Sequence, residues 1–269
     1  MLGKRLLTAA IALPLFAGAL MFLPQVLWGV FLLPFLAIAG WEWGALAGYG
    51  FGARAAYSAL IALSAAALFY VLPSLLAAHT LVDVVVYGAS GLFWLLVAPV
   101  WLKRLWTNRN PWVLGIAGWL ALVPMWLALV HLQATKWLLL LILSVVWVAD
   151  SAAYGAGKAW GKNKLAPRVS PGKTWEGALG AAAAVATYYG LLLVFVPPGE
   201  RYFEGWSGLL VFIAILALSV EGDLFESWMK RQAGVKDSGR IFPGHGGVLD
   251  RIDGLTASVP LAALAYYVR

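Results

Sequence analysis

Residues 6–41 read LLTAAIALPLFAGALMFLPQVLWGVFLLPFLAIAGW and contain no Lys, Arg, Asp or Glu. As one helix, these 36 residues would be about 54 Å long at 1.5 Å per residue, which far exceeds a hydrocarbon core of about 30 Å. The stretch must therefore fold back on itself, and Pro24-Gln25 is the natural turn. Two membrane-spanning helices are predicted here, at 6–22 and 26–46.

The composition of the whole chain gives the same picture. Of its 269 residues, 62% are apolar and 12% are charged, against roughly 45–50% and about 25% in an average soluble domain. This small number of polar side chains cannot cover a water-facing surface. A large part of the surface must therefore face lipid. The chain has no cysteine, which excludes disulfides, thiol nucleophiles and Cys-ligated zinc.

Further apolar segments extend the pattern along the chain. We predict an all-α polytopic integral membrane protein with nine transmembrane helices. The segments predicted to span the membrane are 6–22, 26–46, 56–76, 81–101, 112–131, 137–157, 177–196, 206–227 and 250–267.

Basic residues set the expected orientation. Nine spans with a cytoplasmic N-terminus leave only three of the nineteen basic residues outside, Lys136, Arg201 and Arg269. This asymmetry predicts that the C-terminus lies outside. We expect the protein to reside in the cell inner (cytoplasmic) membrane. It also explains the pI of about 9.7 by topology, so no nucleic-acid partner is expected. The N-terminal helix resembles a signal peptide but lacks a cleavage site followed by polar sequence, so we expect it to be retained.

Acidic residues divide the chain unequally. The first half contains only Glu42 and Asp83, and the second half contains the other ten of the twelve acids. We therefore predict a five-helix scaffold over 1–135 and a four-helix catalytic region over 136–269. The catalytic region includes two long cytoplasmic loops, 158–176 and 228–249.

Several carboxylates are predicted at or below the cytoplasmic membrane surface. The last two charge-free runs, 205–220 and 254–268, contain 16 and 15 residues, or about 24 and 22 Å of helix. Both helices must therefore extend through acidic turns to span the bilayer. Asp150 lies eight residues before Lys158, inside the inner leaflet, where a carboxylate is costly and by default functional.

The spacing of these acids predicts two polar helix faces. Asp223, Ser227 and Lys230 fall on one helical stripe, and Asp250 and Asp253 share a face three residues apart. Two acidic faces that meet would suit Mg²⁺, which binds a few carboxylates together with substrate phosphates. Glu226 lies four residues before Lys230, and we expect a structural ion pair there.

The loop between these helices is rich in glycine and basic residues. Residues 222–254 contain seven glycines, which allow the backbone to approach a ligand closely. Lys and Arg beside exposed amides are the groups that bind phosphate. An ordinary basic loop on anionic lipid headgroups would explain the charge, but not the glycines and interleaved aspartates.

At this point the sequence resembles a known family, the phosphatidate cytidylyltransferases (CDP-diacylglycerol synthases). Ser227–Asp253, SWMKRQAGVKDSGRIFPGHGGVLDRID, resembles the signature of that family without a gap. Three more segments are similar to it: EGDLFE at 221–226, DSAAY at 150–154 and SPGKTWEG at 170–177. The resemblance is specific over about 145–255.

The resemblance implies an enzyme that condenses CTP with phosphatidate, requires Mg²⁺ and releases pyrophosphate. Asp223, Asp250, Lys230 and Arg231 are the expected catalytic residues. The expected substrate-binding residues are Asp150, Lys173, Ser227, Lys236, His245, Gly246, Gly247 and Arg251. One Mg²⁺ or a pair of ions would be held by Asp223 and Asp250, with Asp253 and Asp237 as further ligands.

Other functions stay open on sequence grounds. A cation-coupled transporter would also place carboxylates in the membrane, although these acids cluster at the cytoplasmic end. A CDP-alcohol phosphotransferase would bind a related lipid, but its acidic motif is absent. Acyl-chain preference, oligomeric state (including a homodimer) and the roles of Asp150 and Glu42 are not determined by the sequence.

Overall fold

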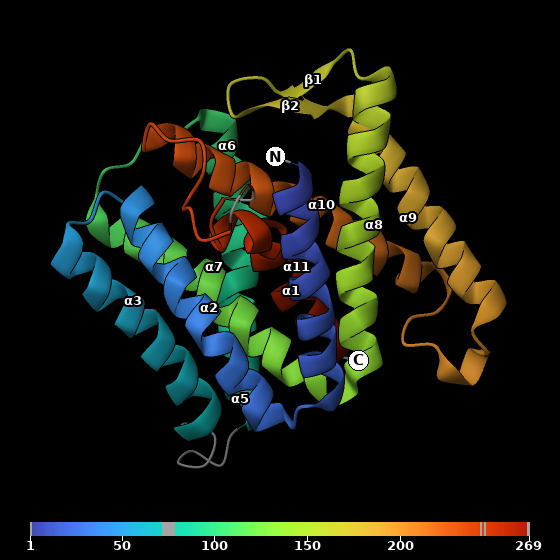
Figure 1. The fold of residues 1–269 in the computed structure, drawn as a ribbon. Helices are drawn as coiled ribbons and strands as arrows, with labels where there is room; N and C mark the ends of the chain where they lie inside the picture. Colours follow the sequence, from blue (N-terminus) through green and yellow to red (C-terminus); the bar gives the residue numbers. More distant parts are fainter. Residues whose placement is uncertain (1, 72–78, 243, 245, 268–269) are drawn as a thin grey trace.

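A computed structural model describes residues 2–71, 79–242, 244 and 246–267. The chain forms a bundle of helices with one small hairpin (Figure 1). The helices are α1 Leu2–Phe22, α2 Gln25–Leu46, α3 Phe51–Ala66, α5 His79–Leu92, α6 Ala98–Arg104, α7 Pro111–Leu132, α8 Lys136–Trp160, α9 Trp175–Phe195, α10 Gly205–Gln232 and α11 Leu249–Tyr267.

Short irregular turns extend or join several of these helices. α3 continues as a π-helical turn, Ala67–Val71, and another, Phe93–Val97, joins α5 to α6. A 3₁₀ turn at Gln133–Thr135 separates α7 from α8, and a second one, Pro198–Glu200, precedes α10. The helices lie close to the predicted spans, although residues 72–76 of the third predicted span lie outside the described residues.

The membrane class is supported by the length and composition of the helices. Within the described residues, six segments are long and apolar enough to cross a bilayer. One of them, Pro111–Trp160, contains both α7 and α8, and neither α1 nor α11 is among the six. The number of nine spans and the orientation of the termini therefore stay predictions. The six segments are Gln25–Leu46, Phe51–Val71, Asp83–Arg104, Pro111–Trp160, Trp175–Phe195 and Gly205–Gln232.

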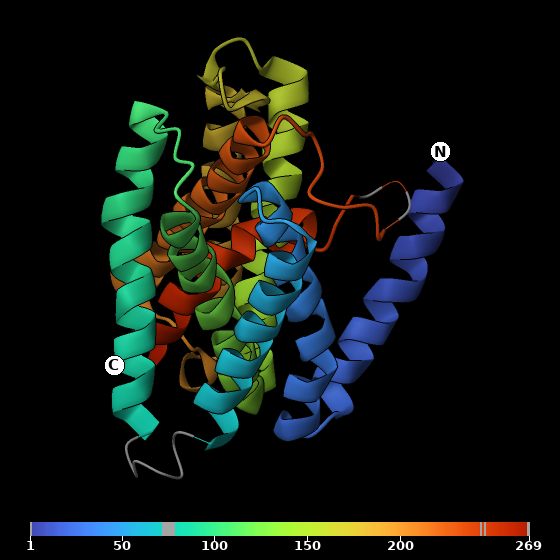
Figure 2. The same ribbon diagram turned by 90° about the vertical axis from the view of Figure 1, so that its left-hand side faces the viewer.

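The predicted turn near residue 24 is confirmed. α1 ends at Phe22, and Pro24 precedes α2 in an extended conformation, with φ −60° and ψ 152°. Proline favours this position because its fixed φ suits a helix start and the position needs no intrahelical N–H donor. Figure 2 shows α1 diverging from α2 beyond their shared turn.

The core links the two halves of the chain through aromatic side chains. Phe225 of α10 is fully buried, and its ring lies 6.3 Å from Trp43 of α2, 5.5 Å from Trp94 and 5.4 Å from Trp101. Large aromatic rings contribute much of the packing energy of a core. This cluster fixes α10 against the first half of the chain, one residue before Glu226.

The loop predicted at 158–176 contains an antiparallel hairpin. Strand β1, Lys164–Ala166, pairs with β2, Ser170–Thr174, beyond the ends of α8 and α9 (Figure 1). The Thr174 hydroxyl accepts a hydrogen bond from Gly177 N at 3.1 Å and so caps α9. The hairpin was not predicted, because two short strands leave little periodic signal among Lys, Gly and Pro residues.

The packing around α7 leads to a first prediction. A methyl group at Gly118 would overlap the Trp43 indole and the Tyr57 hydroxyl, whereas Gly190 of α9 has open space around it. Gly118→Ala should lower the thermal unfolding midpoint in detergent by several degrees, since overpacking costs about 1–3 kcal/mol. Gly190→Ala is the matched control and should leave the midpoint unchanged or slightly raised. Equal midpoints for the two variants would contradict the packing.

Candidate functional site

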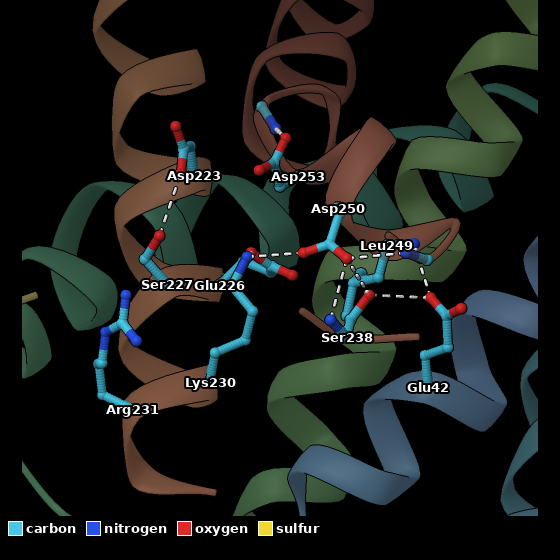
Figure 3. Close-up of polar contacts among 12 residues, drawn as sticks. Glu42, Asp223, Glu226, Ser227, Lys230, Arg231, Ser238, Leu249, Asp250 and Asp253 are labelled. Atoms are coloured by element: carbon cyan, nitrogen blue, oxygen red, sulfur yellow. Dashed lines mark hydrogen bonds and ion pairs between the residues drawn. The ribbon is translucent and has the colours of Figure 1, made fainter. Parts of the chain in front are cut away.

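The predicted charged residues meet where α10 packs against the start of α11. A Cβ at Gly222 would overlap the Asp253 carbonyl oxygen, and one at Gly254 would lie 3.3 Å from Ser219. Glycine at both positions therefore lets the two backbones approach closely. The acidic turns of the two helices face each other as a result (Figure 3).

Lys230 lies at the centre of this cluster. Its Nζ atom donates to Asp250 Oδ1 at 2.7 Å and forms a second ion pair with Glu226. Glu226 is 2% exposed and Lys230 is 8% exposed. Charges removed from water this far need a partner, because an unpaired buried charge is very costly.

The cluster confirms one sequence prediction and corrects another. The ion pair of Glu226 with Lys230 is confirmed. The stripe predicted from spacing is only partly present: Ser227 Oγ donates to Asp223 Oδ1 at 3.2 Å, but the Lys230 ammonium points away from both, toward Asp250 (Figure 3). The long lysine side chain reaches a second helix, which periodicity along one helix cannot predict.

The hairpin is tied to α10 at two points. Lys173 of β2 forms an ion pair with Asp223 at 2.7 Å between Nζ and Oδ2. Arg231 Nε donates to the Val169 carbonyl oxygen at 3.3 Å. The structure thus brings the 158–176 loop to the cluster, as the sequence predicted.

Two further acids lie around Asp223. Asp253 of α11 interacts electrostatically with Asp223, and its Oδ1 accepts from Gly254 N at 2.8 Å. Asp150 of α8 interacts with Lys173, Asp223 and Arg251. Its side chain is exposed although it lies within a candidate membrane span. A carboxylate within a membrane span is expected to face polar groups rather than lipid, and Lys173 and Arg251 are the basic groups that interact with it.

The other oxygen of Asp250 is held by the glycine-rich loop. Asp250 Oδ2 accepts from Ser238 N at 2.9 Å, from Ser238 Oγ at 3.0 Å and from Gly247 N at 2.8 Å. Gly246 has φ of +84°, and a Cβ there would overlap the Asp250 carboxylate. Only glycine fits both constraints. Gly246 and Gly247 therefore support Asp250 directly.

The remaining predicted residues lie outside the buried cluster. Lys236 and Asp237 are exposed on the loop, and Arg251 is exposed next to Asp250. His245 lies outside the described residues. The structure thus gathers Asp223, Lys230, Asp250 and Asp253 in one place, with Lys173 and Ser227 beside them.

A metal ion at this site would need carboxylates from the same cluster. Among the described residues, no group of three or more His, Asp or Glu side chains is arranged to hold a metal. Lys173 and Lys230 instead neutralise Asp223 and Asp250. Mg²⁺ is commonly bound by one or two carboxylates plus substrate phosphates. Asp223 and Asp253, which interact electrostatically, would be the two carboxylates available for that mode.

Sequence reasoning assigned no role to Glu42, which joins the cluster from α2. Its carboxylate is 3% exposed and accepts from Val248 N at 3.1 Å, Leu249 N at 2.8 Å and Ser238 Oγ at 3.0 Å. A signal was present, since an isolated acid in a long apolar segment is by default functional. Its partners lie about 200 residues later and could not be deduced.

The fold and the site together define a class of protein. It is a helical membrane protein whose buried carboxylate–lysine cluster lies beside a glycine-rich basic loop. Residues 3–269 match the cytidylyltransferase family, and the chain belongs to that family. The resemblance noted in the sequence is thereby confirmed.

Named relatives agree with this assignment. The chain is 40% identical over 278 residues to the phosphatidate cytidylyltransferase of Pseudomonas aeruginosa, covering 98% of this chain and 96% of the relative. It is 48% identical over 136 residues to the Haemophilus influenzae protein of that name, covering 48% and 46% of the two chains. It is 52% identical over 130 residues to the one from Brucella melitensis, covering 48% and 45%.

The buried position of Lys230 generates a stability prediction. Lys230→Met leaves two carboxylates without their ammonium partner, and breaking a buried pair in this way costs about 3–5 kcal/mol. The thermal midpoint in detergent should fall strongly, and the double variant Lys230→Met/Glu226→Gln should recover part of the loss. Lys103→Met, at an exposed lysine of α6, is the control. A Lys230→Met midpoint equal to that of the control would contradict the assigned ion pairs.

Proposed function

We propose that the protein is a phosphatidate cytidylyltransferase that condenses CTP with phosphatidate to give CDP-diacylglycerol and pyrophosphate. The similarity to the Pseudomonas aeruginosa enzyme over nearly the whole length of both chains carries this proposal. The residues of the resembling segments also gather around one charged cluster. The alternative of a cation-coupled transporter has no support from the relatives.

The reaction transfers a cytidylyl group from CTP to the phosphate of phosphatidate. A phosphate oxygen of phosphatidate attacks the α-phosphorus of CTP, the bond from that phosphorus to the bridging oxygen breaks, and pyrophosphate leaves. A phosphomonoester has a second pKa of about 6, so the attacking group is largely ionised near neutral pH. The enzyme needs no strong base; it must position two polyanions and neutralise the charge that develops on pyrophosphate.

Basic side chains around the cluster suit that task. We assign phosphate contacts to Lys173 and Lys230, the two lysines that pair with carboxylates of the cluster. We assign further phosphate contacts to the exposed basic residues Arg231 of α10, Lys236 of the loop and Arg251 of α11. Ser227 and the amides of the glycine-rich loop add neutral donors, and Asp150 is assigned to substrate binding from the family resemblance. His245 is assigned to substrate binding from the family resemblance.

Mg²⁺ would be held by Asp223 and Asp253 together with substrate phosphates. Asp250, the other acid assigned to the metal from the resemblance, is held by Lys230 and by the glycine-rich loop and would be a further ligand. The ion, when bound, supplies positive charge that stabilises the pyrophosphate leaving group. Asp237, exposed on the loop, is the weakest of the proposed ligands.

The site is assigned to the cytoplasmic leaflet of the inner membrane. The distribution of basic residues supports nine spans with the N-terminus inside. CTP then enters from the cytosol, and phosphatidate enters laterally from the inner leaflet. The position of Asp150 within α8, with Lys173 and Arg251 among its charged neighbours, supports a polar environment at this level.

A direct assay tests the function. Purified protein in detergent should convert phosphatidate, Mg²⁺ and CTP labelled at the α-phosphate into labelled CDP-diacylglycerol, detected by chromatography. ATP in place of CTP should give little product. Absence of labelled lipid from a folded preparation would refute the proposal.

Asp223 provides the first variant for this assay. Asp223→Asn keeps the shape of the side chain but removes the charge that attracts both Lys173 and Mg²⁺, so turnover should fall at least about a hundredfold. Glu200→Gln changes an exposed acid of the 3₁₀ turn that precedes α10 and should retain wild-type turnover. Asp223→Asn activity within about threefold of wild type at saturating Mg²⁺ would reject its assignment.

The proposed orientation is tested with reporters. A reporter fused after Arg269 should behave as periplasmic, because nine crossings from a cytoplasmic N-terminus end outside. A reporter fused after Arg104, following the fourth predicted span, should behave as cytoplasmic. A cytoplasmic reporter at Arg269 would overturn the number of spans.

A further inference from the structure

We propose that Glu42 is a positioning residue of the cytidylyl-transfer site: it holds Ser238 and the start of α11 at Val248 and Leu249, so that Asp250 faces Lys230 and the loop is shaped to receive CTP. This inference rests on the proposed function. The inference assigns a specific role in substrate binding to α2, a helix of the predicted scaffold region.

The contacts of Glu42 converge on the start of α11. Oε1 accepts from Val248 N at 3.1 Å, and Oε2 accepts from Leu249 N at 2.8 Å. Leu249 is the first residue of α11 and directly precedes Asp250. The N-terminus of a helix carries free N–H groups and a partial positive charge. A carboxylate bound there fixes both the position and the direction of the first turn.

Glu42 and Asp250 share one serine. Ser238 Oγ lies 3.0 Å from Glu42 Oε2 and 3.0 Å from Asp250 Oδ2 (Figure 3). A hydroxyl has a single proton, so Ser238 donates to one carboxylate at a time. The backbone N–H of Ser238 donates to Asp250 as well. A change at Glu42 therefore reaches Asp250 by two routes, through Ser238 and through Leu249.

The surrounding glycines are consistent with a shape built around this carboxylate. A Cβ at either Gly239 or Gly247 would overlap the Glu42 carboxylate. Both lie on the loop that carries the proposed phosphate-binding residues. Burying a carboxylate in an apolar helix is costly unless it is fully hydrogen-bonded. The loop supplies those hydrogen bonds, so loop conformation and Glu42 depend on each other.

The test compares Glu42→Gln with the wild-type enzyme. Glutamine keeps the size of the side chain but replaces one carboxylate oxygen with an NH₂ group. That group is a donor, so it cannot accept a hydrogen bond from the backbone N–H of Val248 or Leu249. We expect the KM for CTP to rise tenfold or more with an unchanged KM for phosphatidate, and faster amide hydrogen exchange across 247–249. A merely structural loss would reduce the amount of active enzyme, lowering kcat while leaving both KM values unchanged.

The control is Asp83→Asn, which alters the other acid of the first half, near His131 of α7. It should leave the KM for CTP and exchange across 247–249 at wild-type values. A Glu42→Gln protein with wild-type KM and wild-type exchange would overturn the inference, and so would loss of kcat alone.

Two further results would need a different measurement: a Glu42→Gln protein that does not fold, and a wild-type protein without activity. If Glu42→Gln does not fold, Ser238→Ala decides, because it removes the shared hydroxyl and leaves the backbone bonds of Glu42 in place. A raised KM for CTP supports the inference, and a wild-type KM overturns it. If the wild-type protein itself forms no CDP-diacylglycerol, the proposed function fails; exchange across 247–249 then decides the role of Glu42 alone.

Discussion

The ammonium group of Lys230 between the carboxylates of Glu226 and Asp250 is the interaction on which the site depends. Each of these charges is costly to bury without a partner. They neutralise one another only if α10 and α11 are aligned so that Lys230 lies beside Asp250. The glycines at 222 and 254 permit that register by letting the helices approach. The aromatic cluster around Phe225 fixes the same turn of α10 against the first half of the chain.

Remote segments are bound to this centre by charge as well. Lys173 ties the hairpin to Asp223, and Glu42 ties α2 to the loop before Asp250. In the proposed function, the lysines that pair with these carboxylates also bind substrate phosphates. The same charges would then both stabilise the fold and bind two polyanionic substrates. Such dual use explains why acids and bases are concentrated in a membrane protein that otherwise avoids them.

Much of this could be predicted from the sequence, for identifiable reasons. Charge-free runs located the helices within a few residues, because the bilayer limits helix length. Glycine density and interleaved aspartates located the loop beside α10 and α11. The partner of Lys230 on another helix, the strands at 164–174 and the bonds of Glu42 could not be predicted. Each depends on three-dimensional proximity between residues that have no regular spacing in the sequence.

The account is tested most directly at Asp250. This residue lies in the first turn of α11 and contacts both Lys230 and the glycine-rich loop. The measurement is transfer of label from α-labelled CTP to phosphatidate by Asp250→Asn, with the thermal midpoint recorded on the same preparation. The account predicts a loss of turnover of at least about a hundredfold in a protein that stays folded. Near-normal turnover at saturating Mg²⁺ would contradict the assignment of Asp250 to the reaction.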